Sequence, residues 1–297
     1  MQIGTFKLIE PIPDLKKPHM LVSLEPWINV GSVGTLTLST LEKHFVAQDL
    51  GKLSDPGTFY DFTRYRPTMY RLEGTRRINV PNSVLKYGKG FGENDVLFLH
   101  IMEPHNRGED LVESVFQIAK EFDVQRYCQI GSMYGPAPHT RPLRASGSST
   151  EETVQKYFKK ENIHGSGYEG PTSIMAMVTE KVRQINVETL SMILQLPSYA
   201  QLEENYKGQE VMLRLIMGLY GFELELSDIA KEAERQRLEL EKAIAVDPRM
   251  VAVVRQLENI YDQEEVPELA KKDDPPLSPQ VEKFLREIEK KDGPPEK

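Results

Sequence analysis

Short apolar runs alternate with segments of helical periodicity along the first 225 residues. Residues 20–24 form an apolar run bounded by prolines, which predicts a buried strand. A loop containing Gly31 and Gly34 follows, and Leu38, Leu41 and Phe45 then recur at helical spacing. The pattern predicts a strand, a glycine-containing loop and a helix in that order.

The same order recurs in the middle of the chain. Residues 95–101 are the clearest strand, residues 109–122 have an apolar face at helical spacing, and residues 126–130 predict the next strand. Strand, helix and strand within about 40 residues favour βαβ units. We therefore expect an α/β fold with a largely parallel central sheet and helices on both faces.

Other segments extend this pattern. Residues 57–90 are rich in Tyr, Arg, Val and Gly and predict hairpin strands. Further elements are predicted as a helix starting near Ser149, a helix over 171–183, a strand over 187–196 and a helix over 203–220 that stops at Gly221.

The last quarter of the chain has a different character. From Asp228 to the end there are 18 acidic and 13 basic residues, so this part carries −5 of the net charge of −8. Ile229, Ala233, Leu240 and Ile244 form a sparse apolar stripe, and a second helix starts at Pro248. We expect a core domain over 1–226, a helical hairpin or arm over 227–263 and a charged, proline-containing tail over 264–297.

Composition narrows the functional class. With 39% hydrophobic residues the chain can form a core, and with a pI near 5.5 it has no global attraction for a phosphate backbone. No run of about 18 apolar residues occurs, the N-terminus lacks the pattern of a signal peptide, and Cys128 is the only cysteine. We expect a cytoplasmic protein with neither a nucleic-acid nor a membrane partner.

Two segments could bind ligands or metals. The Gly31-x-x-Gly34 loop would let a backbone approach an anion at a helix N-terminus, but it is neither G-x-G-x-x-G nor a Walker loop, and a tight turn is the simpler interpretation. His100, Glu103 and His105 could ligate a metal, but Pro104 breaks the helical register of an H-E-x-x-H site. We expect no metal and no cofactor, and Glu103 lining a pocket or the surface.

The most distinctive string is Pro138-His-Thr-Arg-Pro142, which follows the strand over 126–130. Ligands in open α/β sheets bind beyond the carboxyl ends of strands, so Glu103, His139 and Arg141 are expected to converge there if their strands are neighbours. Arginine can hold an acidic group through two parallel hydrogen bonds. The alternative is that His139 and Arg141 only tie the loop down, and no nucleophile motif accompanies them.

Four segments resemble the proteasome assembly chaperone two family, in its prokaryotic branch. They are the Gly31/Gly34 loop with Pro26 and Asn29, Glu103-Pro104, the string over 138–142, and Gly170-Pro171 followed by the apolar run and Pro197-Ser-Tyr199. The resemblance spans about residues 20–225.

The resemblance implies a three-layer α/β/α fold similar to the phosphorylase/hydrolase type, a homo-oligomer, with a trimer favoured, and a site formed by Gly31, Gly34, Glu103, His139, Arg141 and Tyr199. The family's Pro-x-Tyr motif often carries a histidine in the middle, where this chain has Ser198. That difference weakens an enzymatic interpretation.

Two functions follow as alternatives. The first is an oligomeric, chaperone-like binding or assembly protein without assigned catalysis, which contacts a protein partner through its C-terminal arm. The second is a small-molecule hydrolase or phosphorylase-like enzyme that uses a Glu103/His139/Arg141 crevice on an anionic substrate.

Overall fold

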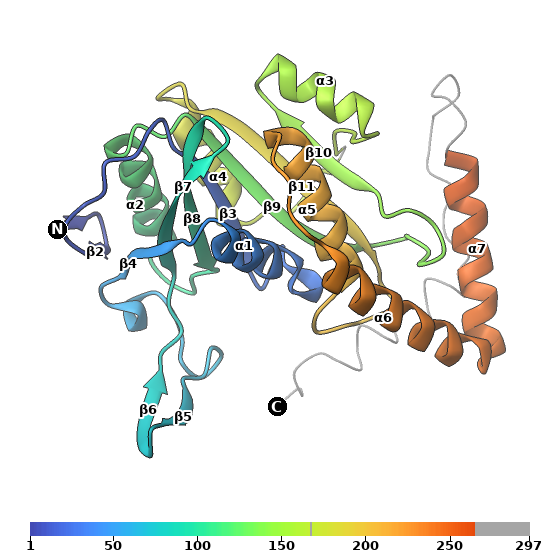
Figure 1. The fold of residues 1–297 in the computed structure, drawn as a ribbon. Helices are drawn as coiled ribbons and strands as arrows, with labels where there is room; N and C mark the ends of the chain where they lie inside the picture. Colours follow the sequence, from blue (N-terminus) through green and yellow to red (C-terminus); the bar gives the residue numbers. More distant parts are fainter. Residues whose placement is uncertain (167, 265–297) are drawn as a thin grey trace.

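The computed structural model describes residues 1–166 and 168–264, which form a mixed α/β fold (Figure 1). Its strands are β1(Gln2–Ile3), β2(Phe6–Leu8), β3(His19–Glu25), β4(Gln48–Leu53), β5(Thr68–Leu72), β6(Thr75–Asn79), β7(Val84–Phe91), β8(Asn94–Met102), β9(Arg126–Gly135), β10(Ala145–Ser149) and β11(Glu188–Pro197). Its α-helices are α1(Val33–His44), α2(Gly108–Glu121), α3(Glu152–Lys160), α4(Ile174–Arg183), α5(Tyr206–Tyr220), α6(Ser227–Ala245) and α7(Pro248–Glu264).

Nine strands form one sheet in the order β1-β2-β4-β7-β8-β3-β9-β11-β10. The central strands β8, β3, β9 and β11 are parallel, as the βαβ pattern predicts. The strands outside this block pair antiparallel with their neighbours. The sheet is therefore mixed rather than largely parallel.

Side chains along β3 point alternately to the two faces of the sheet, and each face is covered by its own apolar cluster. Met20, Val22 and Leu24 face α2 and α4, whereas Leu21 faces the side covered by α1, α3 and α5. Residues 19–24 of β3 are all buried, and burial at successive positions is typical of a strand in a sheet covered on both faces.

Two helices begin later than the sequence predicts, because a capping side chain sets the first helical residue. Helix α3 begins after Glu151, whose carboxylate accepts hydrogen bonds from the Thr153 and Val154 amides, rather than at Ser149. Helix α4 begins after Ser173 rather than at Pro171. Gly221 ends α5 with φ 70°, a left-handed conformation that glycine adopts without a Cβ penalty.

The C-terminal hairpin of α6 and α7 packs on its own chain. Ile244, Val253, Val254 and Leu257 are buried in a third cluster with Tyr199 and Ala200. Ala233 is buried as well, while Ile229 and Leu240 pack against neighbouring clusters, so the sparse stripe of α6 is covered within the chain. The tail predicted over 264–297 lies outside the described residues from 265 onward, and the division into core, arm and tail remains a prediction.

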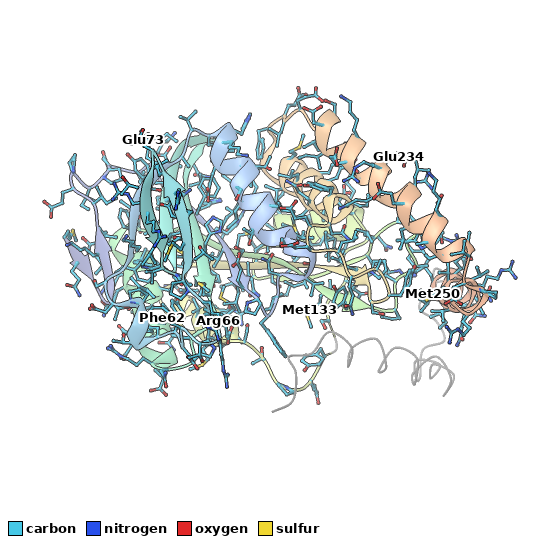
Figure 2. The ribbon with its side chains drawn as sticks, turned by 90° about the horizontal axis from the view of Figure 1, so that it is seen from below. Phe62, Arg66, Glu73, Met133, Glu234 and Met250 are labelled. Carbon is cyan, nitrogen blue, oxygen red and sulfur yellow. The ribbon has the colours of Figure 1, made fainter. Side chains whose placement is uncertain are left out.

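Strands β5 and β6 form a separate two-stranded ribbon that projects away from the large sheet (Figure 1). Figure 2 views the molecule at right angles, with Glu73 of the ribbon turn at one end and Glu234 of α6 and Met250 of α7 at the other. The two views agree that the ribbon and the C-terminal hairpin lie at opposite ends of the molecule.

Within the described part of the chain, no helix combines the length and apolar character needed to cross a membrane.

Candidate functional site

All six candidate residues follow the carboxyl ends of the four parallel strands. Gly31 and Gly34 follow β3, Glu103 follows β8, His139 and Arg141 follow β9, and Tyr199 follows β11. The order of the strands separates them, however, because β3 lies between β8 and β9. The expectation that Glu103 and the His-Thr-Arg string leave neighbouring strands is therefore wrong.

His139 is fixed to the end of β11 by Tyr199. The backbone amide of His139 donates to the Tyr199 hydroxyl at 2.7 Å, and Nδ1 of its ring lies 2.7 Å from the same oxygen. Burial lowers the pKa of His139 and raises the pKa of Tyr199 to about 12. Both side chains are therefore held in their uncharged forms at neutral pH.

Arg141 connects the loop after β9 to α7. Its Nε and Nη2 donate to the two carboxylate oxygens of Asp262, each at 2.8 Å, and Nη1 lies 3.3 Å from Glu258. Thr140 donates to the same Glu258 carboxylate at 2.5 Å. The hydrogen bond from Arg141 lowers the pKa of Asp262. The two parallel hydrogen bonds expected of Arg141 are thus made to a helix of the same chain.

A second arginine extends this attachment. Arg144 donates to the Tyr261 carbonyl at 2.8 Å, and its guanidinium carbon lies 3.7 Å from the centroid of the Tyr261 ring. A cation stacked on an aromatic ring at this distance is attractive. Arg141 and Arg144 together hold the last two turns of α7 against the loop.

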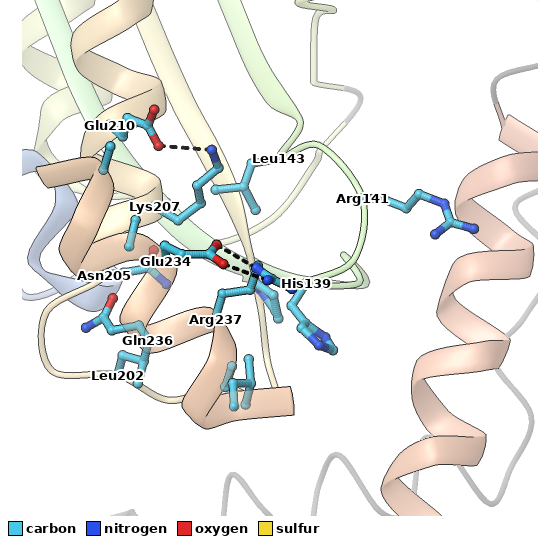
Figure 3. A pocket seen from close by; sticks show the side chains of 15 residues that line it. His139, Arg141, Leu143, Leu202, Asn205, Lys207, Glu210, Glu234, Gln236 and Arg237 are labelled. Carbon is cyan, nitrogen blue, oxygen red and sulfur yellow. Dashed lines mark hydrogen bonds and ion pairs between the residues drawn. The ribbon is translucent and has the colours of Figure 1, made fainter. Parts of the chain in front are cut away.

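A cavity of about 180 Å³ opens between this loop and helices α5 and α6 (Figure 3). Its lining includes His139 and Arg141 together with Asn205, Lys207, Glu210, Glu234 and Arg237. Lys207 lies 3.0 Å from Glu210, and Arg237 lies 2.7 Å from Glu234. The charged side chains of the cavity are therefore largely balanced, and Leu143, Leu202 and Leu240 are among the apolar residues that make up much of the remaining lining. Sequence analysis missed its helical residues, although Glu234 and Arg237 lie one turn apart beside the apolar stripe of α6.

The glycine loop has a structural role that the sequence left open. The Asn29 side-chain oxygen accepts hydrogen bonds from the Gly34 amide at 2.8 Å and the Thr35 amide at 3.2 Å. A Cβ on Gly34 would lie 3.0 Å from that oxygen, so glycine permits the close approach. These helix-start amides, which could have bound an anion, are already hydrogen-bonded.

Gly31 contacts Asn205, which lines the cavity. It has φ 59°, and its carbonyl accepts a hydrogen bond from the Asn205 amide at 2.8 Å. Asn205 in turn caps α5 through its side chain, which accepts from the Gly208 amide at 2.7 Å. The structure therefore brings Gly31, His139, Arg141 and Tyr199 to one region.

Glu103 lies in different surroundings. One carboxylate oxygen accepts a weak hydrogen bond of 3.4 Å from the Ile174 amide, and the other is buried without a hydrogen-bond partner among the described residues. Burial raises the pKa of Glu103. Its backbone amide donates to the Glu25 carbonyl at 2.6 Å, and Glu103 is not among the residues that line the cavity.

The two histidines near Glu103 point elsewhere. His100 hydrogen-bonds to Glu42 of α1, which also pairs with Lys86 at 2.8 Å. His105 accepts from the Asp61 amide at 3.2 Å, and its ring packs edge-on against Tyr65 with centroids 4.6 Å apart. The rings of His100 and His105 therefore contact different elements and do not converge on the Glu103 carboxylate.

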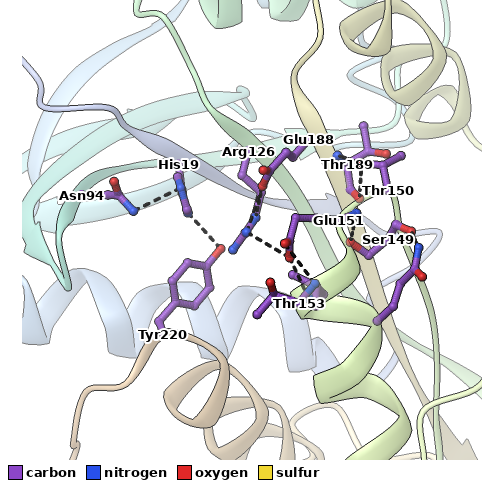
Figure 4. A network of polar contacts seen from close by, with 12 residues as sticks. His19, Asn94, Arg126, Ser149, Thr150, Glu151, Thr153, Glu188, Thr189 and Tyr220 are labelled. Carbon is purple, nitrogen blue, oxygen red and sulfur yellow. Dashed lines mark hydrogen bonds and ion pairs between the residues drawn. The ribbon is translucent and has the colours of Figure 1, made fainter.

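A second polar network lies at the amino ends of the parallel strands, opposite the cavity (Figure 4). His19 contacts the Tyr220 hydroxyl at 3.3 Å and Asn94 at 3.2 Å. Arg126 donates to Glu188 at 2.9 Å. Desolvation and the Arg126 charge lower the pKa of His19 to about 4. Sequence analysis missed this network, although His19, Arg126 and Glu188 each begin a strand.

Comparison with solved structures places this fold among known ones. A PAC2 family protein from Streptomyces avermitilis aligns with TM-score 0.70 at 23% identity over 80% of this chain and 99% of its own. A proteasome-assembly chaperone homologue from Mycobacterium tuberculosis aligns with TM-score 0.68 at 21% identity, over 79% and 99%. PbaB, an archaeal proteasome activator from Pyrococcus furiosus, aligns with TM-score 0.62 at 14% identity, over 82% and 99%.

None of the curated proteins matches this sequence. The model of the PAC2 family matches residues 23–244, which include every candidate site residue and all of α5 and nearly all of α6. The resemblance seen in the four sequence segments is thereby confirmed. The chain belongs to the PAC2 family.

Proposed function

We propose that this chain is an oligomeric binding protein that helps other proteins to assemble, and that it uses its C-terminal hairpin to contact them. One observation carries the proposal. The most distinctive string of the sequence holds α7 in place through Arg141, instead of presenting the guanidinium to a small substrate.

The attachment gives the hairpin a defined position. The polar contacts of Arg141 and Arg144 act beside the buried apolar contacts of Val253, Val254 and Leu257. The outer surface of the hairpin remains exposed and charged, with Leu238 and Val246 among its exposed apolar residues. A fixed arm with apolar positions inside a polar surface has the composition of a protein interface.

The comparisons support the same function. Two of the similar structures come from proteins whose names refer to proteasome assembly or activation. Helices on both faces of the sheet support the three-layer α/β/α arrangement expected from the family. The homo-oligomer, with a trimer favoured, and the cytoplasmic location remain predictions from the sequence.

Affinity capture with three forms of the chain tests this function. The forms are the intact chain, a chain ending at residue 245, and the intact chain with Arg141→Ala. We expect the intact chain to capture a defined protein in constant ratio, and both variants to lose it while keeping the circular dichroism of a folded core. Arg183→Ala, which removes an exposed arginine of α4 outside the hairpin, is the matched control. Capture that is equal in all forms would contradict the proposal.

A second candidate is a binding protein for a small anion. The cavity beside His139 supports it, because it encloses about 180 Å³ and the cationic side chains of Lys207 and Arg237 lie in its lining. The separation of Glu103 from this cavity does not support a joint catalytic role for Glu103, His139 and Arg141. A thermal-shift screen with phosphate, nucleosides, amino acids and short peptides tests this candidate. A stabilising ligand should lose its effect in Lys207→Ala, and a ligand whose effect survives that change binds elsewhere.

A further inference from the structure

The ribbon of β5 and β6 is exposed along its whole length. Every residue from 66 to 80 is exposed, and Met69 and Ile78 each retain 63% of their accessible surface. Leu72 and Tyr70 are also exposed large residues. An isolated two-stranded ribbon is marginally stable in water, because neither of its faces is covered.

The ribbon carries positive charge on an acidic molecule. Residues 66–80 contain four arginines and one glutamate, a net charge of +3, so the other residues of a chain with net charge −8 carry −11. None of these arginines pairs with a carboxylate in the described part of the chain; they are Arg66, Arg71, Arg76 and Arg77.

The register of the ribbon sorts its side chains onto two faces. Met69 lies opposite Ile78, and Arg71 lies opposite Arg76. Because side chains alternate along a strand, these two pairs share one face. Like charges directly opposite one another destabilise a ribbon, unless a carboxylate lies between them. This face is therefore complementary to an acidic surface with an adjacent apolar patch.

The ribbon is attached to the core at its base and closed by a tight turn at its tip. The Tyr65 hydroxyl donates to the Glu103 carbonyl at 3.1 Å, and Phe62 and Tyr65 pack on the core. At the tip, Glu73 and Gly74 both have positive φ, which matches the two-residue turns that close hairpins. The base holds the ribbon away from the large sheet, where it can reach another molecule (Figure 1).

We propose that the ribbon docks on the body of a second copy of this chain, with the Met69, Arg71, Arg76 and Ile78 face inward. The charge complementarity argues for this occupant, because the rest of the same chain carries a net charge of −11. Ribbon-to-ribbon pairing is disfavoured, because it would bring arginines of both copies together. A ribbon that docks on the body of the next copy makes a head-to-tail contact. Such contacts produce a ring when the rotation that relates successive copies returns to the first copy.

This inference rests on the homo-oligomer of the proposed function and assigns its contact surface. It is independent of partner capture by the C-terminal hairpin, because the ribbon and the hairpin lie at opposite ends of the molecule.

Light scattering coupled to gel filtration tests the inference on the intact chain. The variants are Arg71→Glu with Arg76→Glu, and Met69→Ser with Ile78→Ser. The control is Lys159→Glu with Lys160→Glu, which makes the same charge change at exposed positions of α3. We expect the wild type and the control to exceed the 33.9 kDa of one chain, and both ribbon variants to approach it with unchanged thermal unfolding. We expect the dissociation constant to rise at least tenfold, which corresponds to about 1.4 kcal/mol.

A mixing experiment tests the head-to-tail geometry. A chain with Arg71→Glu and Arg76→Glu keeps its body surface, so an excess of it should occupy wild-type ribbons and lower the mass of the wild-type assembly. A mass that stays constant or increases would overturn ribbon-to-body docking.

The remaining outcomes separate the two proposals. A wild type that remains monomeric at a chain concentration of about 100 µM would overturn both the homo-oligomer and the ribbon contact. Ribbon variants that assemble like the wild type would overturn the ribbon contact alone. A short DNA duplex at 150 mM salt should not bind, and binding lost in the arginine variant would assign the ribbon to nucleic acid instead.

Discussion

The Tyr199 hydroxyl oxygen lies 2.7 Å from both the backbone nitrogen and Nδ1 of His139. Since the backbone N–H can only donate, the hydroxyl accepts from it and is free to donate its own proton to Nδ1. This assigns the ring proton of His139 to Nε2. One hydroxyl therefore sets the position of the loop, the orientation of the ring and its tautomer.

Tyr199→Phe should destabilise the protein. It removes both hydrogen bonds and leaves the half-buried amide of His139 without a partner, so we expect a loss of about 1–3 kcal/mol in the free energy of unfolding. Urea denaturation followed by circular dichroism measures the loss. Tyr70→Phe, at an exposed position on the ribbon, should change the free energy by less than about 0.5 kcal/mol. Equal effects at the two positions would show that the Tyr199 hydroxyl contributes nothing.

Arg141→Ala should loosen α7 without unfolding the core. The arginine is partly exposed, so its pairs with Asp262 and Glu258 contribute only about 0.5–1 kcal/mol to global stability. Hydrogen exchange should nevertheless accelerate in the amides of 250–262, while β3 and β9 remain protected. If the amides of α7 exchange at the wild-type rate, the apolar contacts of Leu257 and its neighbours hold the helix alone.

His19 should make stability depend on pH below neutrality. Its folded pKa of about 4 lies below the ordinary histidine value of 6.5, so the unfolded chain binds a proton first as the pH falls. The His19 contribution is complete above pH 6.5 and is lost between pH 6.5 and 4, and it amounts to at most about 3 kcal/mol. Urea denaturation across this range should give a flatter profile for His19→Gln than for the wild type. His164→Gln, an exposed control, should keep the wild-type slope.

Glu103→Gln should stabilise the protein at neutral pH. Burial raises the pKa of Glu103, so the folded state favours the neutral acid, and ionisation at pH 7 leaves a charged oxygen without a partner. The contribution of this carboxyl is favourable at low pH and is lost as the pH rises through the folded pKa. The gain in the free energy of unfolding should therefore be larger at pH 7 than at pH 4. A gain that is independent of pH would show that the Glu103 charge is not its cause.

The sequence by itself determined the central elements. Apolar runs predicted β3, β8 and β11, because a strand buried on both faces of a sheet is apolar at most positions. Apolar residues at helical spacing predicted α1, α2 and α5, because each of these helices buries one face. Gly221 marked the end of α5 for the same local reason. The four segments that resemble the family also led to the correct family from the sequence.

Only the tertiary structure decided which loops meet. Strand order is set by packing between distant segments, and the placement of β3 between β8 and β9 moved Glu103 away from His139. The partner of Arg141 is 121 residues away along the chain, so no local pattern could indicate that α7 neutralises it. The exposure of the β5–β6 ribbon is likewise a property of the fold, because alternating apolar and charged residues look the same whether or not a sheet covers them.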